Sequence, residues 1–148
     1  MDETFSLAET ILEHISDAVI YADDTGTIMR WNPAAATLFG YSAAEALGQK
    51  LDLIIPPELR EAHWRGFDAA TSSGVMDLKG RPTLTRARHR NGHKLYIEMS
   101  FGLVKCYGGL MKCGAVAVAR NAGERAQTLH ARSNGGNGEN GSHGSESA

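Results

Sequence analysis

The sequence has 148 residues, of which 42% are hydrophobic and 22% charged, and its formal net charge is −2 at pH 7. These values are typical of a single globular domain, and they give no electrostatic signal for binding nucleic acid or an anionic membrane. No apolar run approaches the roughly 20 residues that a spanning helix needs, and the start MDETF lacks the features of a signal peptide. We therefore expect a cytoplasmic protein without nucleic-acid or membrane partners.

The chain begins with a segment that is predicted to be a helix. Four apolar side chains recur there at helical spacing and form a narrow stripe: Leu7, Ile11, Leu12 and Ile15. Such a stripe packs either on the domain that follows or on a second copy of the chain, and the sequence leaves both alternatives open. We assign residues 1–16 to this flanking or dimerisation helix.

Two short strands and two short helices are expected next. The runs AVIYA (18–22) and TIMRW (27–31) are separated by DDTG, which is a hairpin signal. In NPAAATLFG, Asn32 is a good N-cap and is followed by a proline at the first helical position. In SAAEALG, Ser42 and Glu45 have the spacing of a capping box. These signals predict two helices directly after the first hairpin.

A longer helix is expected over residues 57–72, and its apolar face contains a histidine. Helical spacing places four side chains on one stripe: Leu59, His63, Phe67 and Ala70. An imidazole therefore lies in the middle of the face that the helix should bury. A lone histidine in such a place is more often a hydrogen-bonded core residue than a ligand, and periodicity alone does not decide between the two.

The second half of the chain changes to a period of two, which is typical of strands. Strands are expected at 83–90 and 93–104, joined by an Asn-Gly turn, and a last strand is expected at 110–120. Together with the earlier elements, this order predicts an α+β fold: a five-stranded antiparallel sheet with helices covering one face.

The folded domain is expected to cover residues 17–120. Residues 121–132 contain helix formers but few apolar side chains, and the run SNGGNGENGSHGSESA that follows has nothing apolar to bury. We therefore expect residues 121–148 to form a polar, mostly disordered tail.

Several of these motifs together resemble those of the PAS family, in its S-box variety. WNPAA, then FGYSAAEALG followed by PPELR, and later GRPTLTRARHRNGHKLYIEMS occur in the order and spacing typical of that family, over roughly residues 10–120. The resemblance implies the PAS fold, whose sheet and helices enclose a cavity that holds haem, flavin, a small acid or nothing. It also implies a role in sensing and dimerisation rather than in catalysis. The run GQKLDLIIPP lacks the cysteine of the flavin-binding light sensors, so we do not expect a flavin–cysteine adduct.

The segment PPELREAH resembles the haem-binding branch of the family, which includes FixL-like and direct oxygen sensor-like domains. That branch places its iron-ligating histidine on the long helix a few residues after the prolines, and this position corresponds to His63. A neutral imidazole is a good ligand for haem iron when it points into an apolar pocket. The resemblance therefore implies a b-type haem bound through His63, which serves as the metal ligand.

The other side of the expected haem departs from this branch. The arginine of FixL-like domains corresponds to Thr83, and the methionine of direct oxygen sensor-like domains corresponds to Arg81. Arg81 remains a candidate donor to a bound diatomic ligand or to a propionate. Besides His63, the residues expected to contact the cofactor are Leu59, Phe67, Leu78, Arg81, Thr83 and Met99.

Other arginines near the expected pocket have different interpretations. The arginine that holds a propionate in FixL-like domains corresponds to Ala69, which leaves Arg60 and Arg65 on the same helix as candidates. The charged run RARHR (86–90) is interpreted as the solvated face of a strand.

The sequence contains no Ser-His-Asp arrangement, P-loop or carboxylate pair, so we do not expect an enzyme. We expect a homodimeric sensor of a gas (O2, CO or NO) or of redox state, which signals to a separate protein. The alternative is a non-haem PAS module for interaction or dimerisation, with a small organic ligand or an empty cavity. Because only a polar tail follows Arg120, the chain either reports to a separate partner or is an excerpt of a longer protein.

Overall fold

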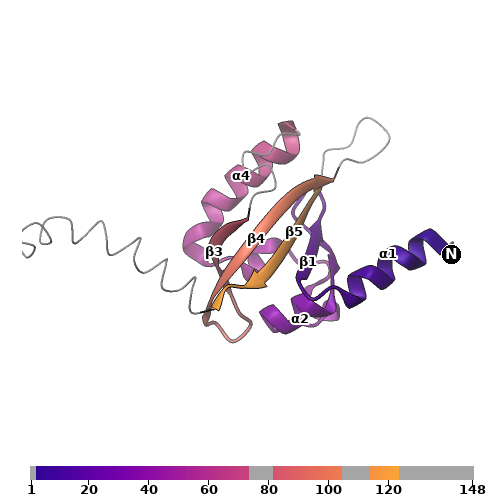
Figure 1. The fold of residues 1–148 in the computed structure, drawn as a ribbon. Coiled ribbons are helices and arrows are strands. Elements are labelled where there is room, and N and C mark those ends of the chain that lie inside the picture. Colours follow the sequence, from indigo (N-terminus) through magenta and orange to yellow (C-terminus); the bar gives the residue numbers. More distant parts are fainter. Residues whose placement is uncertain (1–2, 74–81, 105–113, 124–148) are drawn as a thin grey trace, which may run out of the picture.

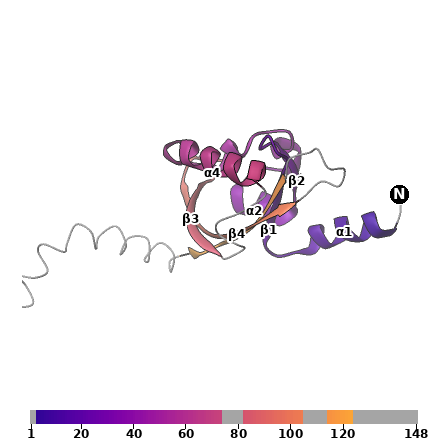
Figure 2. The ribbon, with the colours of Figure 1, turned by 90° about the horizontal axis from the view of Figure 1, so that it is seen from above.

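A computed structural model describes residues 3–73, 82–104 and 114–123 of the chain. Its centre is an antiparallel sheet of five strands in the order β2-β1-β5-β4-β3, and helices cover one face of this sheet (Figures 1 and 2). The predicted α+β fold is thus confirmed. The strands are β1 (Ala18–Ala22), β2 (Ile28–Trp31), β3 (Thr83–Arg88), β4 (Lys94–Val104) and β5 (Gly114–Asn121). The helices are α1 (Glu3–His14), α2 (Pro33–Phe39), α3 (Ala43–Ala46) and α4 (Arg60–Ser73), with the 3₁₀ turns η1 (Leu51–Ile54) and η2 (Pro57–Leu59).

The last strand lies in the middle of the sheet. β5 pairs with β1 on one side and with β4 on the other, so that Ile20 and Phe101 both face Ala117 across the ladder. The described helices α2, α3 and α4 all belong to the connection between β2 and β3. A single connection that passes over one side of the sheet explains why these helices cover the same face.

The core lies between this face and the helices. Its largest fully buried side chains are Phe39, Ile20, Ile28 and Ile97. Burying a side chain of this size contributes about 1.5–3 kcal/mol. On β5, by contrast, the residues that face the helices are alanines, among them Ala115, Ala117 and Ala119. Small side chains in the centre of the sheet leave space between it and the helices.

The predicted N-caps of α2 and α3 are confirmed. Asn32 caps α2, because its side chain accepts a hydrogen bond from the backbone of Ala35 at 3.0 Å, and Gly40 ends the helix with φ +84°. Ser42 and Glu45 form both hydrogen bonds of a capping box at the start of α3. These caps are local in sequence, which is why the sequence alone predicts them.

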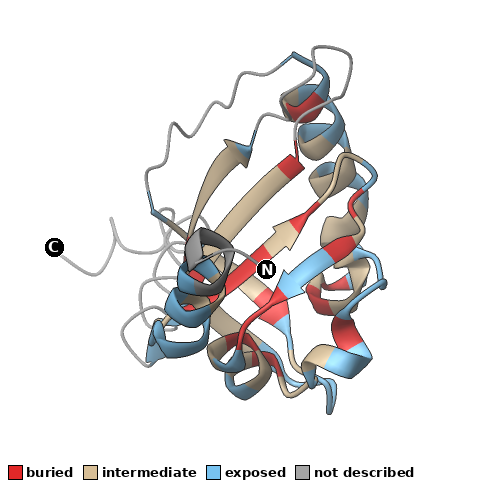
Figure 3. Cartoon of the chain, turned by 90° about the vertical axis from the view of Figure 1, so that its right-hand side faces the viewer, coloured by how far each residue is buried: buried red, intermediate tan, exposed pale blue. Residues whose placement is uncertain are grey.

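The N-terminal helix extends away from the sheet (Figures 1 and 2). Its C-terminal half is tied to the domain, because Arg30 forms an ion pair with Glu9 at 3.1 Å. Three members of the predicted stripe nevertheless remain exposed, Leu7 at 60%, Ile11 at 49% and Ile15 at 36%, and Figure 3 shows the helix mostly in the colour of exposed residues. Within one chain, the apolar stripe of α1 is therefore only partly covered.

The long helix starts three residues later than predicted. Pro56 and Pro57 lead into the 3₁₀ turn η2, and regular α-helix begins only at Arg60. Proline restricts φ to about −65°, and 3₁₀ turns are frequent at the start of α-helices. With 14 residues, α4 is the longest described helix. No helix in the described ranges is both long and apolar enough to cross a membrane.

Candidate functional site: an apolar pocket beneath helix α4

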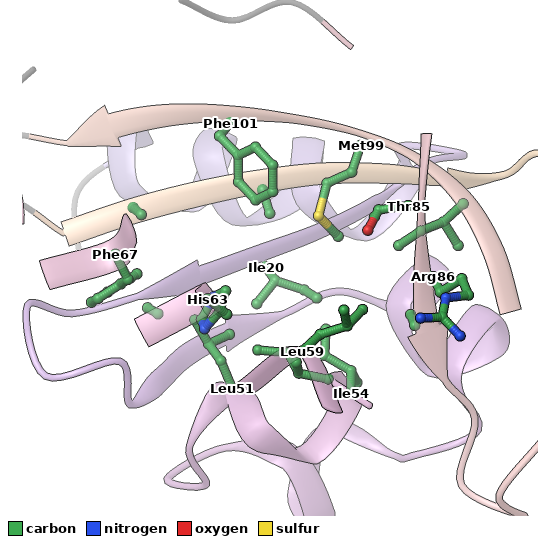
Figure 4. A pocket seen from close by; sticks show the side chains of 16 residues that line it. Ile20, Leu51, Ile54, Leu59, His63, Phe67, Thr85, Arg86, Met99 and Phe101 are labelled. Carbon is green, nitrogen blue, oxygen red and sulfur yellow. The ribbon is translucent and has the colours of Figure 1, made fainter. Parts of the chain in front are cut away.

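A cavity of about 150 Å³ lies between α4 and the sheet (Figure 4). All but three of the described residues that line it are apolar, and the three are His63, Thr85 and Arg86. The lining is made up of Ile20, Ala22, Leu51, Ile54, Ile55, Leu59, His63, Phe67, Thr85, Arg86, Ala87, Ile97, Met99, Phe101, Ala115 and Ala117.

The sheet supplies the floor of this cavity. Ile97, Met99 and Phe101 alternate along β4 and all face the cavity, as the period of two predicts. Ala115 and Ala117 of β5 lie beside them, and their small side chains leave the volume unfilled. The pocket therefore exists because bulky residues on β4 and β1 flank a strand that presents only alanines here.

The roof comes from α4 and the turn before it. Leu59, His63 and Phe67 are spaced by four residues, and the helix turns all three toward the cavity. Ala70, the fourth member of the predicted stripe, is not part of the lining. The structure thus brings three predicted cofactor contacts together with Met99 on the opposite wall (Figure 4).

The environment of His63 favours the neutral form of its imidazole. Its Nδ1 atom is buried and has no hydrogen-bond partner among the described residues. The ring contacts Trp64 at a centroid distance of 4.9 Å and Phe67 at 5.9 Å. Burial lowers the pKa of His63 below its ordinary value of 6.5, and the nearby carboxylates of Asp52 and Asp68 oppose this effect without cancelling it. At neutral pH the ring therefore keeps a nitrogen lone pair available to a ligand.

This pKa shift predicts how stability depends on pH. Because the pKa of His63 is lower in the folded state, the unfolded state binds a proton first as pH falls through about 6.5. The free energy of unfolding should therefore decrease from pH 7.5 toward pH 5.5, before Asp23 and Glu45 titrate, since their pKa values are lowered from 3.8 and 4.5. Urea unfolding of the wild type and of His63→Gln across this range checks it. If the free energy of unfolding changes equally with pH in the two proteins, the pH dependence does not come from His63.

Trp64 fixes the position of α4, a role that the sequence reasoning missed. Its Nε1 donates a hydrogen bond to Oδ1 of Asp52 at 2.7 Å, which links α4 to η1. Its ring also lies directly over Gly26 in the turn between β1 and β2, where an added Cβ would collide with the ring. Because Trp64 follows His63 directly, these contacts also determine where the imidazole is held.

Arg86 lies at the edge of the cavity, which differs from the solvated position interpreted from the sequence. Its side chain is only 21% exposed, and its Nη1 lies 3.4 Å from Oε1 of Glu58 in η2. β3 is one of the two edge strands of the sheet, so a long side chain on it can reach past the edge toward the helix layer. Arg88, two residues later, is exposed as expected.

The structure also shows which of the remaining candidate cofactor contacts line the cavity. Thr85 lines the cavity in place of Thr83, which lies on the same face of β3 two residues earlier. Arg60 does not line the cavity and instead donates hydrogen bonds to the carbonyl groups of Ile55 and Asp52.

The structure does not place three further candidates in the pocket, one because it lies elsewhere and two because they are outside the described residues. Arg65 lies on the exposed surface, with 74% of its side chain accessible, where it pairs with Glu61. Leu78 and Arg81 lie outside the described residues, so their predicted contacts stay predictions.

Comparison with known proteins identifies relatives of this fold and of this sequence. The model of the family described as "PAS fold" matches residues 7–121. The oxygen sensor protein DosP of Escherichia coli is 27% identical over 122 residues, which are 82% of this chain and 15% of that protein. The sensor protein FixL of Bradyrhizobium diazoefficiens is 29% identical over 99 residues, which are 67% of this chain and 20% of that protein.

A solved structure has the same fold as this chain. A PAS domain from Colwellia psychrerythraea superposes with a TM-score of 0.67 at 23% identity, covering 80% of this chain and 97% of that one. At this level of identity the match shows the fold. The chain spans a fifth or less of the length of DosP and FixL. Most of each of these two proteins lies outside the aligned region.

Proposed function

The chain belongs to the PAS family of sensory domains, and we propose that it binds b-type haem through His63. The observation that supports this best is the imidazole itself. It lines an apolar cavity, one of its nitrogens is buried without a hydrogen-bond partner among the described residues, and burial keeps it neutral. The haem-binding branch of the family places its iron ligand at the corresponding position of this helix.

The chemistry of the lining suits a porphyrin. A bound haem brings four nitrogen ligands of its own and supplies an iron that can bind a diatomic gas or change its redox state. The protein therefore needs to provide only one or two ligands, and a single buried imidazole is sufficient. Leu59 at the end of η2, Phe67 on α4 and Met99 on β4 would contact the macrocycle, and they would exclude water from it.

The volume of the cavity sets a condition on this proposal. About 150 Å³ is less than the roughly 300–1,000 Å³ of typical organic ligand sites, so α4 must move away from the sheet to admit a porphyrin. Such a movement would involve the contacts of Trp64 with Asp52 and Gly26, which hold α4 in place. Occupancy of the pocket would thereby be communicated to the turn between β1 and β2.

The same volume favours a second candidate function. A cavity of about 150 Å³ lined by apolar side chains is large enough for a molecule the size of benzene. The chain would then be a PAS module that binds a small organic molecule without haem. His63 would act in it as a polar group on the cavity wall.

In either case we propose a binding protein rather than an enzyme, which reports to a separate protein. An oxygen, carbon monoxide or nitric oxide signal follows from the haem proposal, and the name of the related oxygen sensor supports it. The exposed stripe of α1, including Leu7 and Ile11, supports a homodimer.

Hemin titration of the purified chain tests the haem proposal. The wild type should develop an intense absorption band at about 400 nm that saturates at one equivalent of hemin per chain, because an imidazole that ligates the iron would hold the haem in one position. His63→Ala should weaken hemin binding at least about tenfold and shift the band. The control is His14→Ala, since His14 is exposed on α1 and bonded only to the carbonyl of Thr10 among the described residues.

Two results would contradict the proposal. Equal spectra and affinities for the wild type and His63→Ala would remove His63 as the ligand. Weak absorbance that grows without saturation in all three proteins would remove haem altogether and leave the second candidate function.

A further inference from the structure

One end of the cavity carries a positive charge, the guanidinium group of Arg86. Arg86 lines the cavity from β3, and its side chain is only 21% exposed. Figure 4 shows it well separated from His63, so that the two nitrogen-bearing side chains lie toward opposite ends of the pocket. Apart from these residues and Thr85, the described lining is apolar. The pocket is therefore polarised, with a cation at one end.

Among the described residues, this cation has only a weak partner. Arg86 approaches Glu58 at 3.4 Å, at the long end of ion-pair geometry, and the side chain of Glu58 is 54% exposed. A guanidinium group has five N–H donors arranged to bind a carboxylate through two parallel hydrogen bonds. Most of these donors have no partner in the described residues, although the side chain has lost much of its contact with water. The arrangement is that of an anion site that is only partly satisfied.

We propose that Arg86 binds a carboxylate group of the molecule that enters the pocket. This inference rests on the proposed function, because it assumes that the cavity beneath α4 takes a ligand. The ligand is amphipathic: its apolar part lies between α4 and the sheet, and its carboxylate reaches the edge strand. A haem propionate and the head group of a small organic acid share this chemistry.

The other arginines near the pocket that the structure describes, Arg60 and Arg65, do not offer such a site. Arg60 donates to backbone carbonyl groups of η1 and the residue that follows it, which occupies its donors away from the cavity. Arg65 is exposed on the outer face of α4 and pairs with Glu61. Of the described residues that line the cavity, Arg86 is the one that remains charged at neutral pH, because His63 is neutral there.

Replacing Glu58 provides a second test of the proposal, with an expected effect opposite to that of replacing Arg86. In the ligand-free protein it neutralises Arg86, so an incoming carboxylate must compete with it. Removing this competitor with Glu58→Gln should tighten the binding of acids, whereas removing the anchor with Arg86→Gln should weaken it. A purely structural role of the Arg86–Glu58 pair would make both variants weaken binding alike.

The experiment compares each acid with a neutral molecule of matched shape. Hemin is compared with hemin dimethyl ester, and hexanoate with hexan-1-ol, on the full 148-residue chain by absorbance and calorimetric titration. The proteins are the wild type, Arg86→Gln, Glu58→Gln and Arg88→Gln, in which the control arginine lies exposed on the same strand. Melting temperatures identify any variant that does not fold, and Arg86→Lys then replaces Arg86→Gln as the milder change.

For at least one pair, Arg86→Gln should weaken binding of the acid about tenfold or more and leave its neutral partner within about twofold. Glu58→Gln should tighten binding of the same acid, and Arg88→Gln should change neither. The pair that responds identifies the source of the carboxylate. If the ratio of the affinity for the acid to the affinity for its neutral counterpart is the same in the wild type and in Arg86→Gln, the inference is overturned.

The two proposals fail in different ways. Hemin binding that depends on His63 but not on Arg86 or on esterification overturns the carboxylate anchor and leaves the haem sensor intact. Dependence on Arg86 for hexanoate alone, with no saturable hemin binding, supports the anchor and overturns the haem sensor. If no probe of either pair binds the wild type, both proposals are overturned.

Discussion

Replacing Asn32 by alanine is expected to lower the free energy of unfolding by about 3–5 kcal/mol. Asn32 is only 5% exposed. Its Oδ1 accepts hydrogen bonds from the backbone N–H groups of Val19 at 2.8 Å and Ala35 at 3.0 Å, and its Nδ2 donates to the carbonyls of Leu12 at 3.1 Å and Asp17 at 3.0 Å. One side chain thus joins α1, β1 and α2, and alanine would leave four backbone groups without this partner.

The magnitude follows from two separate losses. Removing the N-cap costs about 0.5–2 kcal/mol, and leaving the buried N–H of Val19 without a partner costs about 1–3 kcal/mol, to which the part-buried bonds to Leu12 and Asp17 add a smaller amount. Chemical denaturation measures the sum. Asn32→Asp keeps the acceptor oxygen and replaces the donor by a second acceptor, so it should also destabilise the fold strongly if the contacts with Leu12 and Asp17 matter.

The control for this prediction is Asn121→Ala. Asn121 is exposed and its side chain accepts one hydrogen bond from Gly123, so its replacement should change stability by less than about 1 kcal/mol. Similar small effects of both alanine variants would mean that the network of Asn32 does not hold α1 and α2 to the sheet.

Replacing Gly26 by alanine is expected to cost about 3–4 kcal/mol and to disturb the pocket. Gly26 has φ +80°, a conformation that costs a residue with a Cβ about 1–2 kcal/mol. Its Cβ would also collide with the ring of Trp64, so α4 would have to shift. Because His63 precedes Trp64, this shift should weaken hemin binding as well as stability.

Gly48 provides a matched control for this substitution. It has φ +86°, but an added Cβ would meet nothing within 4 Å. Gly48→Ala should therefore show the cost of the backbone conformation alone, about 1–2 kcal/mol, with hemin binding unchanged. The difference between the two variants in denaturation measures the collision with Trp64.

A double variant tests whether Trp64 is the cause. Trp64→Ala removes the ring and its hydrogen bond to Asp52, and in that background Gly26→Ala should cost no more than Gly48→Ala does. If Gly26→Ala remains equally costly without the Trp64 ring, the turn between β1 and β2 does not communicate with α4 through this contact.

Features that depend on neighbours along the chain are predictable from the residue types alone. The caps at Asn32 and Ser42, the turn before β4 and the alternation along β4 are local, so the residue types identify them. Helical spacing likewise placed Leu59, His63 and Phe67 on one face, because the geometry of a helix is the same in every fold. The fold class and much of the pocket lining follow from these local patterns.

The tertiary structure decided what depends on residues far apart in the sequence. No local pattern shows that β5 inserts between β1 and β4, or that its alanines leave a cavity of about 150 Å³ opposite His63. The contact of Trp64 with Gly26 joins residues 38 positions apart, from residue 26 to residue 64. Arg86 reads as a solvated strand residue until the sheet order places β3 at the edge, where its side chain reaches the pocket and Glu58. The sequence thus predicts which side chains each element carries, and packing between distant elements determines which of them meet.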